Sequence, residues 1–295
     1  MMKNSLLAAL IAIIAAYCTV KLALPKGVGV TAKETAYERV LRTGVLRCGY
    51  WNWPPLVEVN ANTKELSGIM KEYTDALGEV LNIKVEWTEE LGFADFFLAI
   101  QNNRVDAMCA GVWPMAERAR VMEFTEPVFF IPMHFYVKAD DARFDGNIQA
   151  LNQPGIKFST MDGLVADMML RKYYPQAEVM SITAANSVGE TFDMIAAGKV
   201  DATLNDVIVA QNYMAANPGK IKEVTWPYPV TFFGNTIAVG KDEWALKRML
   251  DIATDQLEAS GAIEQLVRKY ERFPDTLYLP AKPYQALGQK NADEK

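Results

Sequence analysis

The sequence contains a single histidine, three cysteines and no run of lysine or arginine residues. One histidine and the lack of a Cys-x-x-Cys pair leave no ligand set for a metal ion, so no metal or other cofactor is expected. A net charge of −6 without a basic stripe argues against nucleic acid as a partner. The sequence also has no nucleophile elbow, phosphate-binding glycine loop or histidine pair, so we expect a binding protein and not an enzyme.

The N-terminal residues 1–24 differ in composition from the rest of the chain. Lys3 precedes an apolar stretch, residues 5–20, and Lys21 follows it. This pattern is typical of an export signal or of a short membrane anchor, and no clear Ala-x-Ala cleavage site decides between the two. Lipidation of Cys18 is disfavoured because Tyr17 stands where a small residue is expected. We therefore expect a periplasmic or extracellular protein, held at the membrane if this segment is not removed.

Two cysteines remain outside the N-terminal segment. Cys48 and Cys109 both lie in apolar stretches that read as strands. Two buried thiols are one interpretation, and a disulfide formed in an oxidising compartment is the other. The sequence leaves both open.

The length of 295 residues favours two lobes, and short apolar runs alternate with segments of helical periodicity. Such alternation predicts an α/β fold with mainly parallel sheets and crossover helices. The segments read as strand, helix, strand, helix and strand are residues 45–49, 69–81, 83–87, 93–102 and 105–111.

An internal similarity supports two lobes of the same construction. Residues 98–111 and 192–206 share a helix end, a turn, a basic residue, the triplet Val-Asp-Ala and an apolar strand. Ligands of open α/β sheets bind beyond the carboxyl ends of the strands. The residues at and just after Gly111 and those near Asp206 are therefore expected to face each other across a cleft.

The lobe boundaries follow from two extended apolar runs, residues 129–138 and 231–240, which read as crossover strands between the lobes. The predicted domains are a linker over 25–38, a first lobe made of 39–131 plus 233–274, a second lobe over 132–232, and a C-terminal tail over 275–295.

Several stretches between residues 38 and 274 resemble the family 3 extracellular solute-binding proteins, the polar amino-acid-binding proteins of ABC importers. The resemblance rests on LRTGVLRCGYWNWPPL, LAIQNNRVDAMCAG, ERARVMEFTEPVFF and VDATLND. It implies a type II periplasmic-binding-protein fold, in which two Rossmann-like lobes with mainly parallel sheets are joined by two crossover hinge strands.

The same resemblance assigns the two ends of an amino-acid ligand. Arg118 matches the arginine that pairs with the ligand carboxylate, a role that suits the planar fork of a guanidinium. Asp206 matches the acid of the second lobe that accepts the α-ammonium group. The alternatives are a solvated surface charge for Arg118 and a helix N-cap for Asp206.

This sequence also departs from the family pattern. The usual Gly-aromatic-Asp is replaced by Gly-Ile-Met at residues 68–70, so that acid is missing. Trp113 stands where a small hydroxyl residue is common. Our alignment places Asp162 at the position of a hydroxyl that helps to hold the carboxylate, where its charge would repel the ligand. A shifted register would place Thr160 there instead.

Aromatic residues follow the predicted strands of the first lobe. The resemblance implies that Trp53 and Phe93 enclose the ligand side chain, and Tyr50 and Trp113 would extend this to a cage. Packing within the lobe is the alternative for part of this set. Trp51 is expected to point away from the cleft, because its neighbours alternate with it.

The resemblance implies a monomeric protein that closes on a small carboxylate-bearing solute, an amino acid or an analogue, and delivers it to the permease of an ABC importer. A membrane-tethered ligand-sensing or accessory module is an alternative. A second alternative is an enzyme like cyclohexadienyl dehydratase, with Asp162 as general acid. The one histidine, His134, is expected to be structural.

Overall fold

The computed structural model describes residues 34–92, 95–183 and 187–281. The predicted export signal or anchor at residues 1–24 lies outside this range. Across the described ranges, no helix has the length and apolar character needed to cross a membrane.

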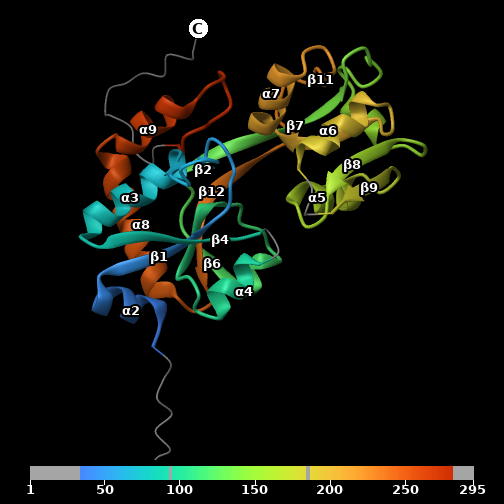
Figure 1. Cartoon of the computed structure of the whole chain (residues 1–295). Coiled ribbons are helices and arrows are strands. Elements are labelled where there is room, and N and C mark those ends of the chain that lie inside the picture. The colour runs from blue at the N-terminus through green and yellow to red at the C-terminus, as the bar shows by residue number, and fades with distance from the viewer. Residues whose placement is uncertain (1–33, 93–94, 184–186, 282–295) are drawn as a thin grey trace, which may run out of the picture. The chain divides into compact units, whose positions relative to one another are not determined.

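Strands and helices alternate along the described chain, as the sequence predicts (Figure 1). The strands are β1 (Val45–Tyr50), β2 (Glu58–Val59), β3 (Leu66–Ser67), β4 (Lys84–Glu90), β5 (Ala107–Val112), β6 (Met122–Phe124), β7 (Phe129–Lys138), β8 (Lys157–Met161), β9 (Glu178–Ile182), β10 (Ala202–Asp206), β11 (Ile221–Glu223) and β12 (Thr231–Gly240). The helices are α2 (Ala36–Thr43), α3 (Ile69–Leu81), α4 (Phe96–Gln101), α5 (Val165–Tyr173), α6 (Gly189–Ala196), α7 (Val207–Ala216), α8 (Trp244–Ala259) and α9 (Ala262–Tyr270), with short 3-10 turns η1 (Arg118–Arg120) and η2 (Ile148–Leu151).

The strands of the two lobes follow the same order. Hydrogen bonding runs β4-β1-β5-β12-β7-β10-β8-β9, so the first half reads β4-β1-β5-β12 and the second, from its outer edge, β9-β8-β10-β7. In each half the first three strands are parallel and the fourth is antiparallel to its neighbour. Each lobe is therefore built on a mainly parallel sheet.

Strands β7 and β12 connect the two sheets at the positions predicted for the crossovers. The first half of β12, residues 231–235, pairs with β7, and its second half pairs with β5 and β6 of the first lobe. β7 pairs in turn with β10 of the second lobe. The backbone of β12 thus belongs to both sheets.

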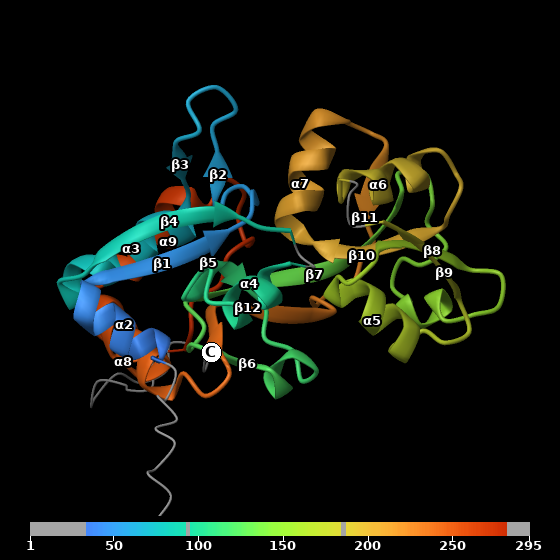
Figure 2. The ribbon, with the colours of Figure 1, turned by 60° about the horizontal axis from the view of Figure 1, so that its bottom comes forward.

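Helices cover both faces of the second sheet, with α5 on one side and α6 and α7 on the other (Figure 2). Alternation along β7 explains this arrangement, since successive side chains of a strand point to opposite faces. Phe135 and Val137 belong to the apolar cluster that includes α5, whereas Tyr136 between them packs with Phe192 of α6 and Ala210 of α7. A sheet buried on both faces is typical of parallel α/β folds.

The sequence similarity between the lobes corresponds to a shared structural motif. Asp106 accepts a hydrogen bond from the backbone N–H of Arg47 at 2.7 Å, and its own N–H donates to the Arg47 carbonyl. Asp201 makes the same two contacts with Lys157, at 2.9 Å for the side-chain bond. In the first lobe the aspartate before β5 therefore binds the backbone of β1, and in the second lobe the aspartate before β10 binds the backbone of β8 in the same way. Each carboxylate also pairs with arginine, Asp201 with Arg143 at 2.6 Å.

A disulfide joins Cys48 of β1 to Cys109 of β5, with the two Cα atoms 5.5 Å apart. Both residues are fully buried in the apolar cluster of the first lobe. The sequence left open two buried thiols or a disulfide, and the structure contains the disulfide. It links neighbouring strands and closes a loop over a sequence separation of 61 residues.

The beginning of the predicted tail packs on the first strand of the hinge. Tyr278 exchanges two backbone hydrogen bonds with Phe130, and its ring meets Phe232 edge-on at 5.0 Å. Leu277 is buried. The final residues, 282–295, lie outside the described range.

Candidate functional site

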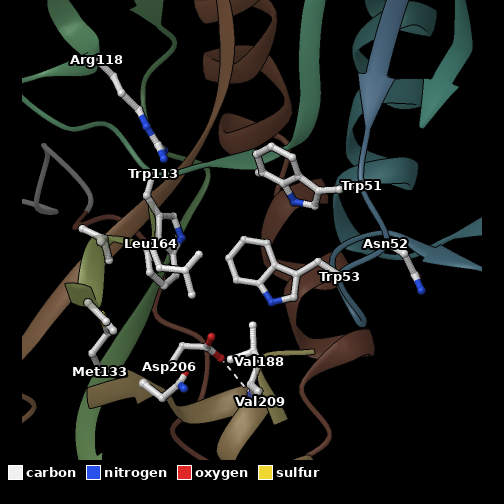
Figure 3. Close-up of a pocket in the computed structure, with 14 residues that line it drawn as sticks. Trp51, Asn52, Trp53, Trp113, Arg118, Met133, Leu164, Val188, Asp206 and Val209 are labelled. Carbon is white, nitrogen blue, oxygen red and sulfur yellow. Dashed lines mark hydrogen bonds between the residues drawn. The ribbon is translucent and has the colours of Figure 1, made fainter. Parts of the chain in front are cut away.

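A cavity of about 130 Å³ lies where strands of both lobes end (Figure 3). Residues 51–53 follow β1, Trp113 follows β5, Leu164 comes shortly after β8, and Asp206 closes β10. This is the position at which open α/β sheets bind ligands. The lining residues are Trp51, Asn52, Trp53, Gly111, Trp113 and Arg118 from the first lobe, and Met133, Leu164, Val165, Ala166, Val188, Asn205, Asp206 and Val209 from the second.

Arg118, at the start of η1, brings a partly desolvated cation to this cavity. Its Nη2 donates a long hydrogen bond of 3.5 Å to the carbonyl of Gly163, and its guanidinium carbon lies 5.6 Å from the centre of the Phe96 ring. Among the residues that the structure describes, no carboxylate forms an ion pair with it. Burial lowers the pKa of Arg118, and the neighbouring Glu117 carboxylate opposes this effect. An anion bound at the guanidinium would compensate the lost hydration.

Asp206 is both a helix cap and part of the cavity wall. Its carboxylate accepts the backbone N–H of Val209 at 2.9 Å, so the N-cap role weighed from the sequence is present. The side chain is buried, and Val207 and Ile208, which follow it, pack into the apolar cluster of the first lobe. Burial raises the pKa of the Asp206 carboxyl group to about 6, although backbone N–H donors act in the opposite direction. Within the described ranges it has no cationic partner.

The start of α5 adds a second feature suited to anions. Leu164 is its N-cap and makes no side-chain capping bond, so no capping side chain satisfies the first N–H groups of this helix. Leu164, Val165 and Ala166 all line the cavity beside Arg118. Free N–H groups and the positive end of the helix dipole favour a negative charge at this place.

Trp113 is held by residues of the crossover strand β12. Its ring stacks on Phe233 with 4.8 Å between centroids and an angle of 10°, and its Nε1 donates to Asn235 Oδ1 at 3.1 Å. Trp53 meets Trp113 edge-on at 5.4 Å. Two residues of the predicted aromatic cage, Trp53 and Trp113, therefore form one wall of the cavity.

Gly111 allows β5 to pass close to neighbouring side chains. Its φ of +85° is strained for any residue with a side chain, and an added Cβ atom would lie 2.8 Å from Leu56 Cδ2 and 3.0 Å from Asn235 Oδ1. Only glycine fits this position without a shift of its neighbours, including the residue that holds Trp113.

The position of Trp51 differs from the one predicted from the sequence. Alternation predicts that it points away from the cleft, but it is buried, lies in the cavity wall and meets Phe96 edge-on at 5.5 Å. The physical reason is that β1 ends at Tyr50, so the strand period of two does not extend into residues 51–53.

Three further residues proposed for the site do not line this cavity. Tyr50 meets Trp87 edge-on at 5.9 Å within the first lobe. Thr160 is buried within β8, and Asp162 is exposed, with its N–H donating to the carbonyl of Ile182. We therefore omit these three from the proposed ligand contacts. Phe93 lies outside the described residues.

The apolar residues that the second lobe contributes to the cavity were not predicted from the sequence. Leu164, Val188 and Val209 each stand at or near the start of a helix, α5, α6 and α7 respectively. For Leu164 the available signal was Gly163, because a glycine shortly after a predicted strand indicates a turn into the next helix; the structure gives it a positive φ.

Comparisons with known proteins cover most of this chain. The profile of the bacterial extracellular solute-binding proteins, family 3, matches residues 46–273. The L-arginine-binding protein of Pseudomonas aeruginosa is 26% identical in an alignment of 223 residues that covers 71% of this chain and 81% of that relative. A probable histidine-binding protein of Neisseria gonorrhoeae is 24% identical over 208 residues, 70% of this chain and 75% of that relative.

The fold has close counterparts among solved structures. A crystal structure of an ancestral amino-acid-binding protein, described as a precursor of cyclohexadienyl dehydratase, matches with a TM-score of 0.68 and 22% identity, over 80% of this chain and 99% of that chain. The protein belongs to the family 3 extracellular solute-binding proteins. The predicted family and the two-lobed α/β fold are confirmed.

Proposed function

We propose that the protein binds one small amino acid between its lobes and delivers it to the permease of an ABC importer outside the cytoplasm. Arg118 and the start of α5 bind the ligand carboxylate, and Asp206 binds the α-ammonium group. The cavity of about 130 Å³ suits a single amino acid better than a peptide. Similarity to the arginine- and histidine-binding relatives supports an amino acid as ligand.

One observation carries this proposal: a cation and an acid from different lobes line the same cavity, and neither has an ionic partner among the described residues. Figure 3 places Arg118 and Asp206 at opposite ends of the view, with Trp53 and Leu164 between them. A zwitterion would satisfy both groups. Only a conformation in which both lobes contact the ligand uses both charges, so ligand binding favours closure.

Thermal unfolding with single L-amino acids tests the proposal. A ligand present at about 100 times its Kd stabilises the folded state by about 2.7 kcal/mol, which corresponds to a rise in Tm of roughly 5–10 °C. Analogues that lack either the carboxylate or the ammonium group are the controls and should give no rise. If no L-amino acid raises the Tm, the proposed function is wrong.

Binding is expected to weaken at acid pH because only ionised Asp206 attracts an ammonium group. With a pKa of about 6, the ionised fraction falls about tenfold between pH 7.5 and pH 5, and the apparent Kd should rise by the same factor. Calorimetric titrations at both pH values measure this. In Asp206→Asn the affinity should be low and independent of pH. If Asp206→Asn binds the ligand with normal affinity, Asp206 acts only as a helix cap, and its assignment to the α-ammonium group is wrong.

The same pKa predicts the opposite effect on the unliganded fold. Because the folded pKa lies above the ordinary value of 3.8, the folded state binds the proton more tightly, and its stability falls as pH rises from about 4 to 6. This amounts to about 3 kcal/mol. Asp206→Asn should therefore be more stable than the parent at pH 7, since asparagine also caps helices well.

The structure gives less support to the two alternatives, a dehydratase-like enzyme and a membrane-tethered module. A dehydratase would need Asp162 as an acid beside the substrate, and Asp162 is exposed and away from the cavity. His134 lies with its Nδ1 2.7 Å from Glu223 Oε1 on the hinge strand and does not line the cavity. The membrane-tethered module depends on residues 1–24, which lie outside the described range, and stays a hypothesis.

A further inference from the structure

Under the proposed function, Arg118 and Asp206 both bind the backbone end of an amino acid. The remaining lining residues must therefore determine which ligand side chain the cavity accepts. Among the described lining residues, Arg118 and Asp206 are the only charged ones.

The two amide side chains of the lining make hydrogen bonds within the protein. Asn205 donates to Thr191 Oγ1 at 3.3 Å and accepts from the N–H of Asp206 at 3.2 Å. Asn52 accepts from the N–H of Val59 at 3.1 Å, and Figure 3 shows its side chain directed away from Trp51 and Trp53. Neither amide is placed to replace the hydration of a polar ligand side chain.

The remaining walls are apolar and come from both lobes. Trp53 and Trp113 form one side, and Leu164, Val188 and Val209 form the other. Met70, where the family pattern has an acid, is fully buried; its Cγ would lie 3.4 Å from a Cβ atom added at Gly111. A charged ligand side chain would lose its hydration here and would meet no opposite charge among the described lining residues beyond those that hold the backbone end; a cation would find only the faces of Trp53 and Trp113. An apolar side chain, in contrast, gains from leaving water.

We infer that this cavity selects an amino acid with an uncharged, apolar side chain and discriminates against arginine, lysine and glutamate. The inference rests on the proposed function and adds the ligand class to it. It separates this protein from the relatives named for arginine and histidine.

Calorimetric titration of the purified full chain tests the ligand class, with L-leucine, L-methionine and L-phenylalanine on one side and L-arginine, L-lysine and L-glutamate on the other. The best apolar amino acid should bind at least about tenfold more tightly than every charged one, which is the lower end of what burial of one apolar side chain provides. A smaller ratio overturns the inference but leaves the proposed function intact. If none of the six binds and the wider screen of L-amino acids also fails, the proposed function itself is wrong.

A substitution in the apolar wall gives a second test. Val188→Glu places a carboxylate in the cavity and should raise the ratio of arginine to leucine affinity by at least about tenfold. Ile252→Glu, on the exposed face of α8, is the matched control and should leave the ratio unchanged. An unchanged ratio in folded Val188→Glu contradicts the assignment of this wall to the ligand side chain. If Val188→Glu does not fold, the titrations of the wild-type protein decide whether the cavity prefers apolar amino acids.

Discussion

Replacing Arg118 by alanine is expected to weaken amino-acid binding by at least about 30-fold. Loss of one partner from a desolvated, hydrogen-bonded charge pair costs about 2–5 kcal/mol, and each 1.4 kcal/mol is a factor of ten in affinity. The interaction lost is the one with the ligand carboxylate, because the guanidinium has no carboxylate partner among the residues that the structure describes. Isothermal titration measures the change, and the rise in Tm with ligand should disappear.

The stability of the unliganded protein should change little in this variant, since Arg118 contributes only a long hydrogen bond to Gly163 and a contact with Phe96. Arg120→Ala is the matched control, because Arg120 lies on the same turn and is exposed. It should bind like the parent. Near wild-type affinity in Arg118→Ala would show that the carboxylate is held elsewhere.

Loss of the Cys48–Cys109 disulfide is expected to lower the free energy of unfolding by about 4 kcal/mol. The disulfide closes a loop over a separation of 61 residues, and loops of this length restrict the unfolded chain by about that amount. Guanidinium unfolding of Cys48→Ala/Cys109→Ala should show the loss as a shifted midpoint with a Tm lower by roughly 8–16 °C.

Two comparisons separate the disulfide from the packing of the cysteine side chains. The parent unfolded with a reducing agent should match the double variant, and the same agent should have no effect on that variant. All of these proteins carry Cys18→Ser, which removes the third thiol as a source of exchange. A loss below about 1 kcal/mol would mean that the unfolded state is already restricted in this region.

The elements of the fold could be predicted well because their signals are local and repeated. The crossover strands β7 and β12 have the bounds that the apolar runs indicate, and the similarity between residues 98–111 and 192–206 is a true structural repeat. A strand buried on both faces leaves a continuous apolar run in the sequence, and such runs are visible in β5, β7 and β12.

The composition of the cavity wall was less predictable because it depends on loops. Alternation ends where β1 ends, so counting along the strand placed Trp51 on the wrong side and gave Tyr50 a role that the geometry does not support. After β8 a turn of positive φ at Gly163 separates Asp162 from Leu164. Alignment could not show which of these two faces the cavity, since the outcome depends on the turn and not on periodicity.

The aromatic wall of the cavity is part of the connection between the lobes. Phe233 and Asn235, which hold Trp113 from two directions, lie in the half of β12 that pairs with β7. Any rotation of one lobe against the other must bend this strand, and a bend there moves the support of Trp113. Under the proposed function, contact of the ligand with Trp113 and rotation of the lobes are therefore coupled through β12.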